Sequence, residues 1–186
     1  EIAKTTDLYF YSVNSSGKSA VCKSHFILAK NDLKCTLSSA PSSQYSGNGS
    51  QTLVDGLFGN EDFRLGGWLG YEGNDLDAIV DLGNETSVHS ISAHCMQDIN
   101  AWIFMPVKIT FSLSGDGINF EEVGNVDNRT PNDRAGNITD NFQLSIDPQN
   151  ARYIKVSYKS IGICPPGHKG NGGKAWFFTD EISVNK

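Results

Sequence analysis

The residues of this sequence that could carry chemistry are aromatic and polar side chains gathered in loop-like stretches. Trp102 is the clearest of them, because it lies in the loop-like stretch 98–106, which has Gln97 and Asp98 at its start. The apolar face of an indole can cover the C–H face of a sugar ring, while amide and carboxylate groups bind the ring hydroxyls. This pattern predicts a sugar-binding surface at Trp102, Gln97 and Asp98. A tryptophan packed into the core is the alternative interpretation.

Two further polar loops can extend such a surface. Arg129 and Asn137 occur in one long polar stretch, and His168 occurs in a glycine-rich stretch that ends shortly before Trp176. Arginine, asparagine and histidine side chains carry donors and acceptors that match hydroxyl groups. We expect these side chains to join Trp102 in binding a ligand. For Arg129 and His168 the alternative is a solvated loop position, and for Trp176 it is core packing.

Three pairs of adjacent carboxylates invite comparison with a glycosidase, which needs two acidic groups about 5–10 Å apart. The pairs are Glu61/Asp62, Glu121/Glu122 and Asp180/Glu181. Neighbouring residues on a strand point to opposite faces of the sheet, so we expect none of these pairs to converge. The sequence also lacks the G-x-S-x-G pattern of serine hydrolases. We therefore predict no enzymatic activity in this chain.

Composition argues against several other classes of protein. The formal net charge is −6, and no Lys/Arg cluster occurs that could displace counterions from a nucleic acid. No apolar run reaches the length of about 18 residues that a transmembrane helix requires. Charged residues make up only 19% of the chain and glycine occurs 19 times, which is typical of a turn-rich all-β protein. The start at Glu1 without a signal peptide favours a processed or excised chain.

Short apolar runs separated by turn residues predict about eight strands and no long helix. In the larger part of the chain the expected strands are 78–82, 88–96, 107–113, 142–146, 153–158, 174–178 and 181–184. Alternation is clear where Ile109, Phe111 and Leu113 share one face. The Ser-Gly-Asp-Gly run at 114–117 predicts a tight turn. The pattern indicates a β-sandwich or jelly roll.

The first part of the chain predicts a separate β-hairpin. Residues 7–13 and 20–29 have the composition of strands, and the Asn-Ser-Ser-Gly run at 14–17 supplies a turn. Two strands alone bury too little apolar surface to be stable. The hairpin therefore either packs on the sandwich or is the end of a preceding domain.

The domain boundary is expected near residue 38. A Ser- and Gly-rich stretch over 38–50 has the composition of a linker or of an ordered loop at the start of a domain. We expect a hairpin piece over 1–38 and a sandwich domain over 39–186.

The four cysteines show no metal-binding spacing. They are Cys22, Cys35, Cys95 and Cys164. A chain of this length can bury a core without disulfides, so four buried thiols are expected. A single bridge, either Cys95–Cys164 or Cys22–Cys35, is the alternative.

Five short motifs carry a resemblance to a known family. They are Leu53-Val-Asp-Gly56, Ala78-Ile-Val-Asp-Leu-Gly83, Ser112-Leu-Ser-Gly-Asp-Gly117 followed by Phe120, Ala151-Arg-Tyr-Ile-Lys-Val156 and Asp180-Glu-Ile-Ser-Val184. In this order and at this spacing, the chain from about residue 40 onward resembles the discoidin, or coagulation-factor (F5/8) type C, family. The resemblance implies a galactose-binding-domain-like jelly roll, sugar binding by loops at one end, and often one structural calcium ion.

The resemblance narrows to accessory modules of bacterial glycosidases. The motifs are Trp68-Leu-Gly-Tyr-Glu-Gly73, Gln97-Asp98 with Trp102-Ile-Phe104 and Pro106, and Gly172-Gly-Lys-Ala-Trp176. They are similar to C-terminal modules of β-hexosaminidases and chitobiases, notably those of gut Bacteroides. Such proteins carry a catalytic barrel, then a small immunoglobulin-like domain, then this module. The hairpin would be a remnant of that intervening domain.

The same resemblance implies a calcium site. In the family, an Asp of an early Asp-Gly loop and a Glu near the last strand hold the ion, and they correspond to Asp55 and Glu181. Carboxylate oxygens are ligands that Ca²⁺ prefers. Asp62 and Asn60 are expected as additional oxygen ligands. A turn cap at Asp55 and a surface position for Glu181 are the alternatives.

Together these observations predict a non-catalytic carbohydrate-binding module of a secreted β-hexosaminidase- or chitobiase-like glycosidase. We expect it to be monomeric and to bind a glycan of the GlcNAc, GalNAc or galactose type. We expect its parent to be secreted, or to lie in the periplasm or on the outer membrane of a Gram-negative bacterium. No nucleic-acid partner is expected. The alternative function is a structural domain that contacts and orients the catalytic domain of the parent without binding sugar. A lipid or protein adhesin is disfavoured, because neither paired apolar loop tips nor a basic rim is visible.

Overall fold

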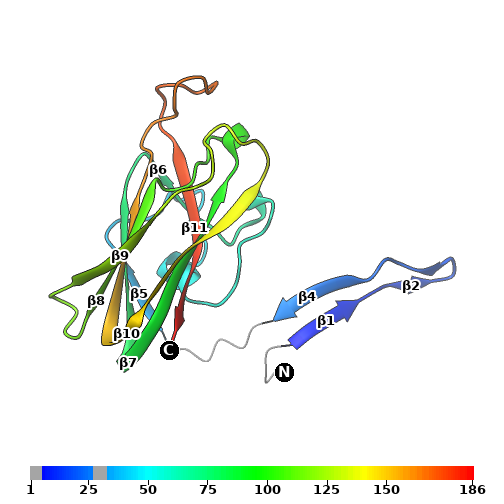
Figure 1. Cartoon of the computed structure of the whole chain (residues 1–186). Helices are drawn as coiled ribbons and strands as arrows, with labels where there is room; N and C mark the ends of the chain where they lie inside the picture. The colour runs from blue at the N-terminus through cyan, green and yellow to red at the C-terminus, as the bar shows by residue number, and fades with distance from the viewer. Residues whose placement is uncertain (1–5, 27–32) are drawn as a thin grey trace. The chain divides into compact units, whose positions relative to one another are not determined.

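The chain forms two compact units, which are described separately. The computed structural model describes residues 6–26 and 33–186 (Figure 1). The first unit spans Glu1–Lys30 and the second spans Asn31–Lys186.

The first unit contains the expected β-hairpin. Its strands are β1 (Thr6–Phe10), β2 (Val13–Asn14), β3 (Gly17–Lys18) and β4 (Cys22–Phe26). β1 pairs with β4 and β2 pairs with β3, in both cases antiparallel. The turn forms where it was predicted, because Asn14 Oδ1 accepts a hydrogen bond from Ser16 N at 2.8 Å and Gly17 adopts a positive φ of 127°. Residues 27–29 of the second expected strand lie outside the described residues.

The second unit is an antiparallel β-sandwich. Its strands are β5 (Lys34–Leu37), β6 (Leu69–Glu72), β7 (Leu76–Gln97), β8 (Lys108–Ser114), β9 (Glu121–Asp127), β10 (Ile138–Lys159) and β11 (Trp176–Asn185). Three short 3₁₀ helices, η1 (Gly49–Leu53), η2 (Phe63–Leu65) and η3 (Ile99–Ala101), lie in its loops.

Two long strands, β7 and β10, connect the layers of the sandwich. The first half of β7 pairs with β5 and with the end of β10, and its second half pairs with β11 and with the start of β10. The β7–β10 pairing shifts register between Ser145 and Gln149 and again between Ala151 and Tyr153. Gly83, opposite the second shift, has a φ of 81°, so both strands change direction in this region. One layer therefore runs β5-β7-β10-β8-β9 and the other β6-β11-β7-β10 (Figure 1). The expected strands 174–178 and 181–184 likewise merge in β11, so six expected strands form three continuous ones.

The core lies between these layers and follows the predicted alternation. Phe111, Ile154 and Phe177 come from three different strands, and each has no exposed surface. They belong to one apolar cluster that also includes Ile109 and Leu113. The buried face expected for β8 is therefore confirmed.

The sandwich unit includes residues that precede the expected domain boundary near residue 38. Residues 34–37 form β5, which pairs with β7, so the sandwich unit begins at Asn31. The following polar stretch is an ordered loop: Ser42 N donates to Gly70 O and Gly70 N donates to Tyr45 O, both at 2.9 Å. These bonds attach the loop to β6.

All four cysteines are free thiols. Cys35, Cys95 and Cys164 are buried as predicted, whereas Cys22 is exposed on the hairpin, so the expectation of four buried thiols is wrong for that residue. Burial raises the pKa of the Cys35 thiol to about 12. Within the described residues, no helix is long and apolar enough to cross a lipid bilayer.

Candidate functional site

The loops at one end of the sandwich gather around Trp102. η3 ends at this residue, which adopts a left-handed backbone with φ 66° and donates its N–H to Ile99 O at 3.1 Å. Trp102 O accepts the N–H of Trp176 at 2.9 Å, which ties the loop to the first residue of β11. A non-glycine residue in this conformation is uncommon and is often found at functional positions.

The Trp102 ring packs on two glycines and remains partly open. A Cβ atom at Gly170 would lie 2.7 Å from the indole and one at Gly173 would lie 3.1 Å from it. The residue is nevertheless 36% exposed, more than the other two tryptophans of the chain. The glycines therefore support a ring that still offers surface to a ligand, and full core packing does not describe it.

His168 holds the neighbouring loop in place. Its Nε2 lies 2.7 Å from Ile99 O, and its Nδ1 accepts the N–H of Gly170 at 3.1 Å. Because a carbonyl can only accept, Nε2 carries the proton of a neutral ring. The ring also makes edge contacts with Phe104 and Trp102, at centroid distances of 5.2 and 6.2 Å. His168 thus lies beside Trp102 as predicted, but both of its nitrogens are engaged within the protein.

Gln97 is a positioning residue and not a surface contact. It has no exposed surface, and its Nε2 donates to Pro131 O at 2.9 Å and to Arg134 O at 3.2 Å. The predicted direct contact of Gln97 with a sugar is therefore corrected, because a ligand cannot reach it. Its bonds fix the loop that carries Asn132 and Asp133.

A hollow of about 510 Å³ lies next to this framework. It is lined by Ile99, Asn132, Asp133, Pro165, Pro166, Gly167 and His168. Asn132 and Asp133 were not singled out from the sequence, where they appear as two of many polar loop residues. Their place follows from the bonds of Gln97, which no sequence pattern reveals.

The remaining predicted sugar contacts are dispersed. Asp98 caps η3 by accepting the N–H of Asn100 at 3.1 Å. The rings of Trp176 and Tyr45 pack edge to face with their centroids 5.4 Å apart, in line with the core-packing alternative for Trp176. Arg129, which lies between β9 and β10, lines a separate hollow of about 210 Å³ together with residues of those two strands. The Asn137 amide donates to Glu61 O in a different loop.

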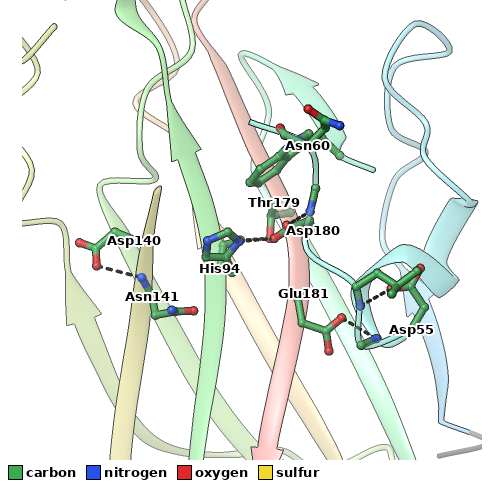
Figure 2. A network of polar contacts seen from close by, with 12 residues as sticks. Asp55, Asn60, His94, Asp140, Asn141, Thr179, Asp180 and Glu181 are labelled. Atoms are coloured by element: carbon green, nitrogen blue, oxygen red, sulfur yellow. Dashed lines mark hydrogen bonds and ion pairs between the residues drawn. The ribbon is translucent and has the colours of Figure 1, made fainter. Parts of the chain in front are cut away.

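A second cluster lies where the loop before η2 meets β11 (Figure 2). Glu181 Oε2 accepts the N–H of Gly56 at 3.0 Å, and Asp55 Oδ1 accepts that of Leu57 at 2.9 Å. Burial, together with the nearby Asp55 and Asp180 carboxylates, raises the pKa of the Glu181 carboxyl from 4.5 to about 8. Burial also raises the pKa of Asp55. Two predicted metal ligands therefore converge and repel each other electrostatically.

A β-bulge explains why Asp180 and Glu181 reach the same loop. The register between β11 and β7 shifts between Thr179 and Glu181, which leaves Asp180 as an extra residue. Asp180 Oδ2 accepts the N–H of Gly59, close to the bond between Glu181 and the same loop. The expectation that neighbouring carboxylates of this pair point apart is wrong here, because the bulge breaks the alternation.

Asp180 also pairs with His94, which sequence reasoning missed. The atoms His94 Nδ1 and Asp180 Oδ1 are 2.6 Å apart, and Asp180 has no exposed surface. The His94 ring stacks on Trp68 at 5.5 Å and meets the edge of Phe58 at 4.7 Å. In the sequence His94 is one of several polar residues of the expected strand 88–96, with His89, Ser90 and Ser92, so no pattern marks it out.

The third predicted metal ligand is not part of this cluster. Asp62 caps η2 and pairs with Arg64, whose Nε lies 2.7 Å from Asp62 Oδ1. Over residues 6–26 and 33–186, no group of three or more His, Cys, Asp or Glu side chains is arranged to hold a metal ion. The Asp55–Glu181 pair fits a hard cation as two carboxylates that backbone oxygens would complete. Asp62 does not fit that set.

Comparison with known proteins connects this architecture to a family. The F5/8 type C domain family matches residues 37–176. The chain resembles the C-terminal domain of a chitobiase from Bacteroides fragilis, with 21% identity, a TM-score of 0.50, and coverage of 85% of this chain and 95% of that one. A chitosan-binding module of a chitosanase/glucanase from Paenibacillus sp. IK-5 gives 14% identity, a TM-score of 0.55, and coverage of 84% and 96%.

A third solved structure has the same fold. It is the family 32 carbohydrate-binding module of NanJ from Clostridium perfringens, in complex with galactose, with 16% identity, a TM-score of 0.50, and coverage of 82% of this chain and 92% of that one. A search among curated proteins finds no match. The sandwich is therefore that of galactose-binding-like carbohydrate-binding modules, and the chain belongs to the F5/8 type C, or discoidin, family.

Proposed function

We propose that this chain is a non-catalytic module that attaches a parent glycosidase to glycans containing hexosamine or galactose. The observation that carries the proposal is Trp102, an aromatic surface held in a fixed orientation beside a polar hollow. The indole supplies an apolar face, and Asn132 and Asp133 supply hydrogen-bonding groups within the same loop cluster. The similarity to a galactose-binding module and to a chitobiase domain supports the ligand class and the type of parent.

A module of this kind acts by concentrating its enzyme on the substrate. Even a weak site raises the effective concentration of a tethered catalytic domain at the glycan surface. We place the parent outside the cytoplasm of a Gram-negative bacterium, where such glycans are encountered.

A sugar titration tests this function. We expect GlcNAc, GalNAc or galactose to shift the Trp102 indole N–H and the backbone amides of His168 and Gly170 in the ¹⁵N-labelled chain at millimolar concentration. Trp102→Ala should abolish the shifts of the two amides and leave the fold intact, because the ring is partly exposed. Ile118→Ala, which removes an apolar side chain that is 81% exposed outside this loop cluster, is the control. If none of the three sugars shifts any loop resonance, the carbohydrate function is wrong.

We also propose that Asp55 and Glu181 hold a structural calcium ion. The ion would relieve the repulsion between their carboxylates and join the loop before η2 to β11. A ligand that binds only the folded state raises the melting temperature. Adding Ca²⁺ after EDTA treatment should therefore raise the Tm at pH 8, and an unchanged Tm would contradict the site.

The hairpin supports a second role, contact with another domain of the parent. Tyr9, Phe10 and Tyr11 are 60%, 47% and 50% exposed on a two-stranded sheet that cannot stabilise itself. We propose that these side chains pack in an immunoglobulin-like domain that precedes the module. A parent fragment extended toward its N-terminus should protect the β1 and β4 amides from hydrogen exchange, and equal exchange in both lengths would oppose this role.

A further inference from the structure

A further hollow of the sandwich unit lies away from Trp102. It measures about 610 Å³ and separates two segments, residues 44–52 and residues 55–68. Neither its aromatic nor its polar residues belong to the surface proposed above, apart from Asp55 at the calcium pair. This groove, defined by those two segments, has no role in the proposed function.

Both walls of the groove are anchored, so its shape is preformed. The first wall is held on β6 by the bond from Gly70 N to Tyr45 O at 2.9 Å and by a β-bridge between Ser46 and Leu69. The second wall is held where Trp68 Nε1 donates to Asn60 O at 2.9 Å. A site whose walls are already ordered loses little conformational entropy when a ligand binds.

Aromatic rings form the apolar part of the groove. Tyr45 and Phe63 meet edge to face at 5.7 Å, and both pack on Phe178 behind them, at 4.7 and 5.4 Å. Their positions are therefore fixed by the core. Phe63 is buried and Arg64 lies over its ring. The partly exposed Tyr45 and the exposed Phe58 therefore supply the apolar surface that a ligand can reach.

Amide side chains form its polar part. Asn60 Oδ1 accepts the N–H of Asp62 at 3.1 Å, and no bond from its Nδ2 occurs among the described residues. Figure 2 shows this carboxamide directed away from Asp180. Asn48 makes no side-chain capping bond to η1, and the amide of Gln44 donates to the Tyr45 hydroxyl at 3.1 Å. Donors and acceptors thus flank the rings.

The charges that line the groove favour a neutral ligand. Its one lining cation, Arg64, already pairs with Asp62 at 2.7 Å, so no uncompensated positive charge awaits a phosphate or carboxylate. Aromatic faces and flanking amides match an uncharged, hydroxyl-rich ring, and the lining carboxylate of Asp55 opposes an anionic ligand. We propose that this groove is a second carbohydrate site, for one or two residues of a neutral glycan. A protein segment is the less favoured occupant, because loops line the groove and offer no strand edge to extend.

The two sites are joined through one residue. Trp176 donates its N–H to Trp102 O, and its ring packs on Tyr45 of the groove at 5.4 Å. Both sites therefore sit on one rigid unit and can engage two parts of a branched glycan or two neighbouring chains. Simultaneous engagement raises the overall affinity without new contacts at either site.

Separate indole signals distinguish the two sites in one titration. With ¹⁵N-labelled full chain and added GlcNAc, galactose or triacetylchitotriose, we expect the Trp68 indole and the Gly66 and Gly67 amides to shift. These shifts should persist in Trp102→Ala. Asn48→Ala and Asn60→Ala should each weaken them about tenfold, the effect of losing one ligand hydrogen bond. Asn74→Ala, at an exposed position outside the groove, is the matched control.

The outcomes separate this inference from the proposed function. If sugars move only the Trp102 signal, the groove is not a carbohydrate site while the function stands. If a hydrophobic peptide moves the groove signals and no sugar does, the groove binds a protein and the inference is overturned. Should Asn60→Ala disturb the fold through its turn bond, Asn48→Ala still decides, because its side chain makes no capping bond.

Discussion

Two loop regions of the sandwich unit are ordered by different forces. The Trp102 loops are held by packing and by hydrogen bonds between uncharged groups. The indole packs on Gly170 and Gly173, and the Gln97 amide donates hydrogen bonds to the loop that carries Asn132 and Asp133. The loop over residues 55–68 is instead held by buried carboxylates of β11, through N–H groups of its own backbone.

This difference has a functional consequence. A region held by packing keeps its geometry over a wide range of pH and metal concentration, which suits a ligand-binding surface. A region held by converging carboxylates responds to protons and cations, because both relieve the same repulsion. The loop over residues 55–68, which is also one wall of the proposed groove, is therefore expected to respond to pH and to cation concentration. The following predictions test this contrast.

The largest effect is expected from Asp180→Ala. The change leaves the N–H of Gly59 and the His94 ring without their buried partner. Leaving a buried polar group without its hydrogen-bond partner costs about 1–3 kcal/mol, and this change leaves two such groups. Urea denaturation should show a loss of that size, whereas Asp77→Ala, at an exposed carboxylate, should change stability little. Equal effects of the two changes would mean that Asp180 does not hold the loop.

Glu181 should make the metal-free protein less stable as the pH rises. Its pKa is raised from 4.5 to about 8 in the folded state, so between these values the folded chain keeps a proton that the unfolded chain has lost. Stability then falls with rising pH across this window, by up to a few kcal/mol. In EDTA the wild-type Tm should decline from pH 5 to pH 8 by more than that of Glu181→Gln. A parallel decline in both proteins would refute the assignment.

The sequence predicted the sandwich because its strands obey local rules. Phe111 and Ile154 alternate with polar neighbours, and both are fully buried as expected. β9 was missed because its sequence, EEVGNVD, is polar and mostly exposed at the sheet edge. β6 was missed because four residues, LGYE, show no alternation. Such strands form through pairing with a neighbour, which lies far away in the sequence.

The candidate site was predictable only in part, for the same reason. Trp102 and the Asp55–Glu181 pair could be named from residue type and family resemblance. The roles of Gln97 and Asp180 could not, because the first depends on a loop more than 30 residues away and the second on a bulge. A bulge changes which face a residue occupies, and no periodic pattern records it.

Packing at the Trp102 loop should be sensitive to one methyl group. Gly170→Ala would place Cβ 2.7 Å from the indole, so the ring must move. We expect sugar affinity to fall about tenfold, or ~1.4 kcal/mol, with unchanged dependence on pH and calcium. Gly115→Ala is the matched control, since its Cβ meets nothing within 4 Å. Calorimetric titration with the sugar that binds most tightly measures both, and equal affinity in both variants would show that ring position does not set binding.

Asp62→Asn is expected to have the smallest effect, and it tests whether Asp62 is a calcium ligand besides Asp55 and Glu181. Asp62 is partly exposed and pairs with Arg64, whose hydrogen bond lowers the Asp62 pKa, so this carboxylate is engaged outside the Asp55–Glu181 cluster. The variant should keep the increase in Tm that Ca²⁺ gives the wild type at pH 8, whereas Asp55→Asn should lose it. An Asp62→Asn protein that no longer responds to Ca²⁺ would place Asp62 among the ligands. The loop would then have to reorganise around the ion, because in its present geometry Asp62 caps η2.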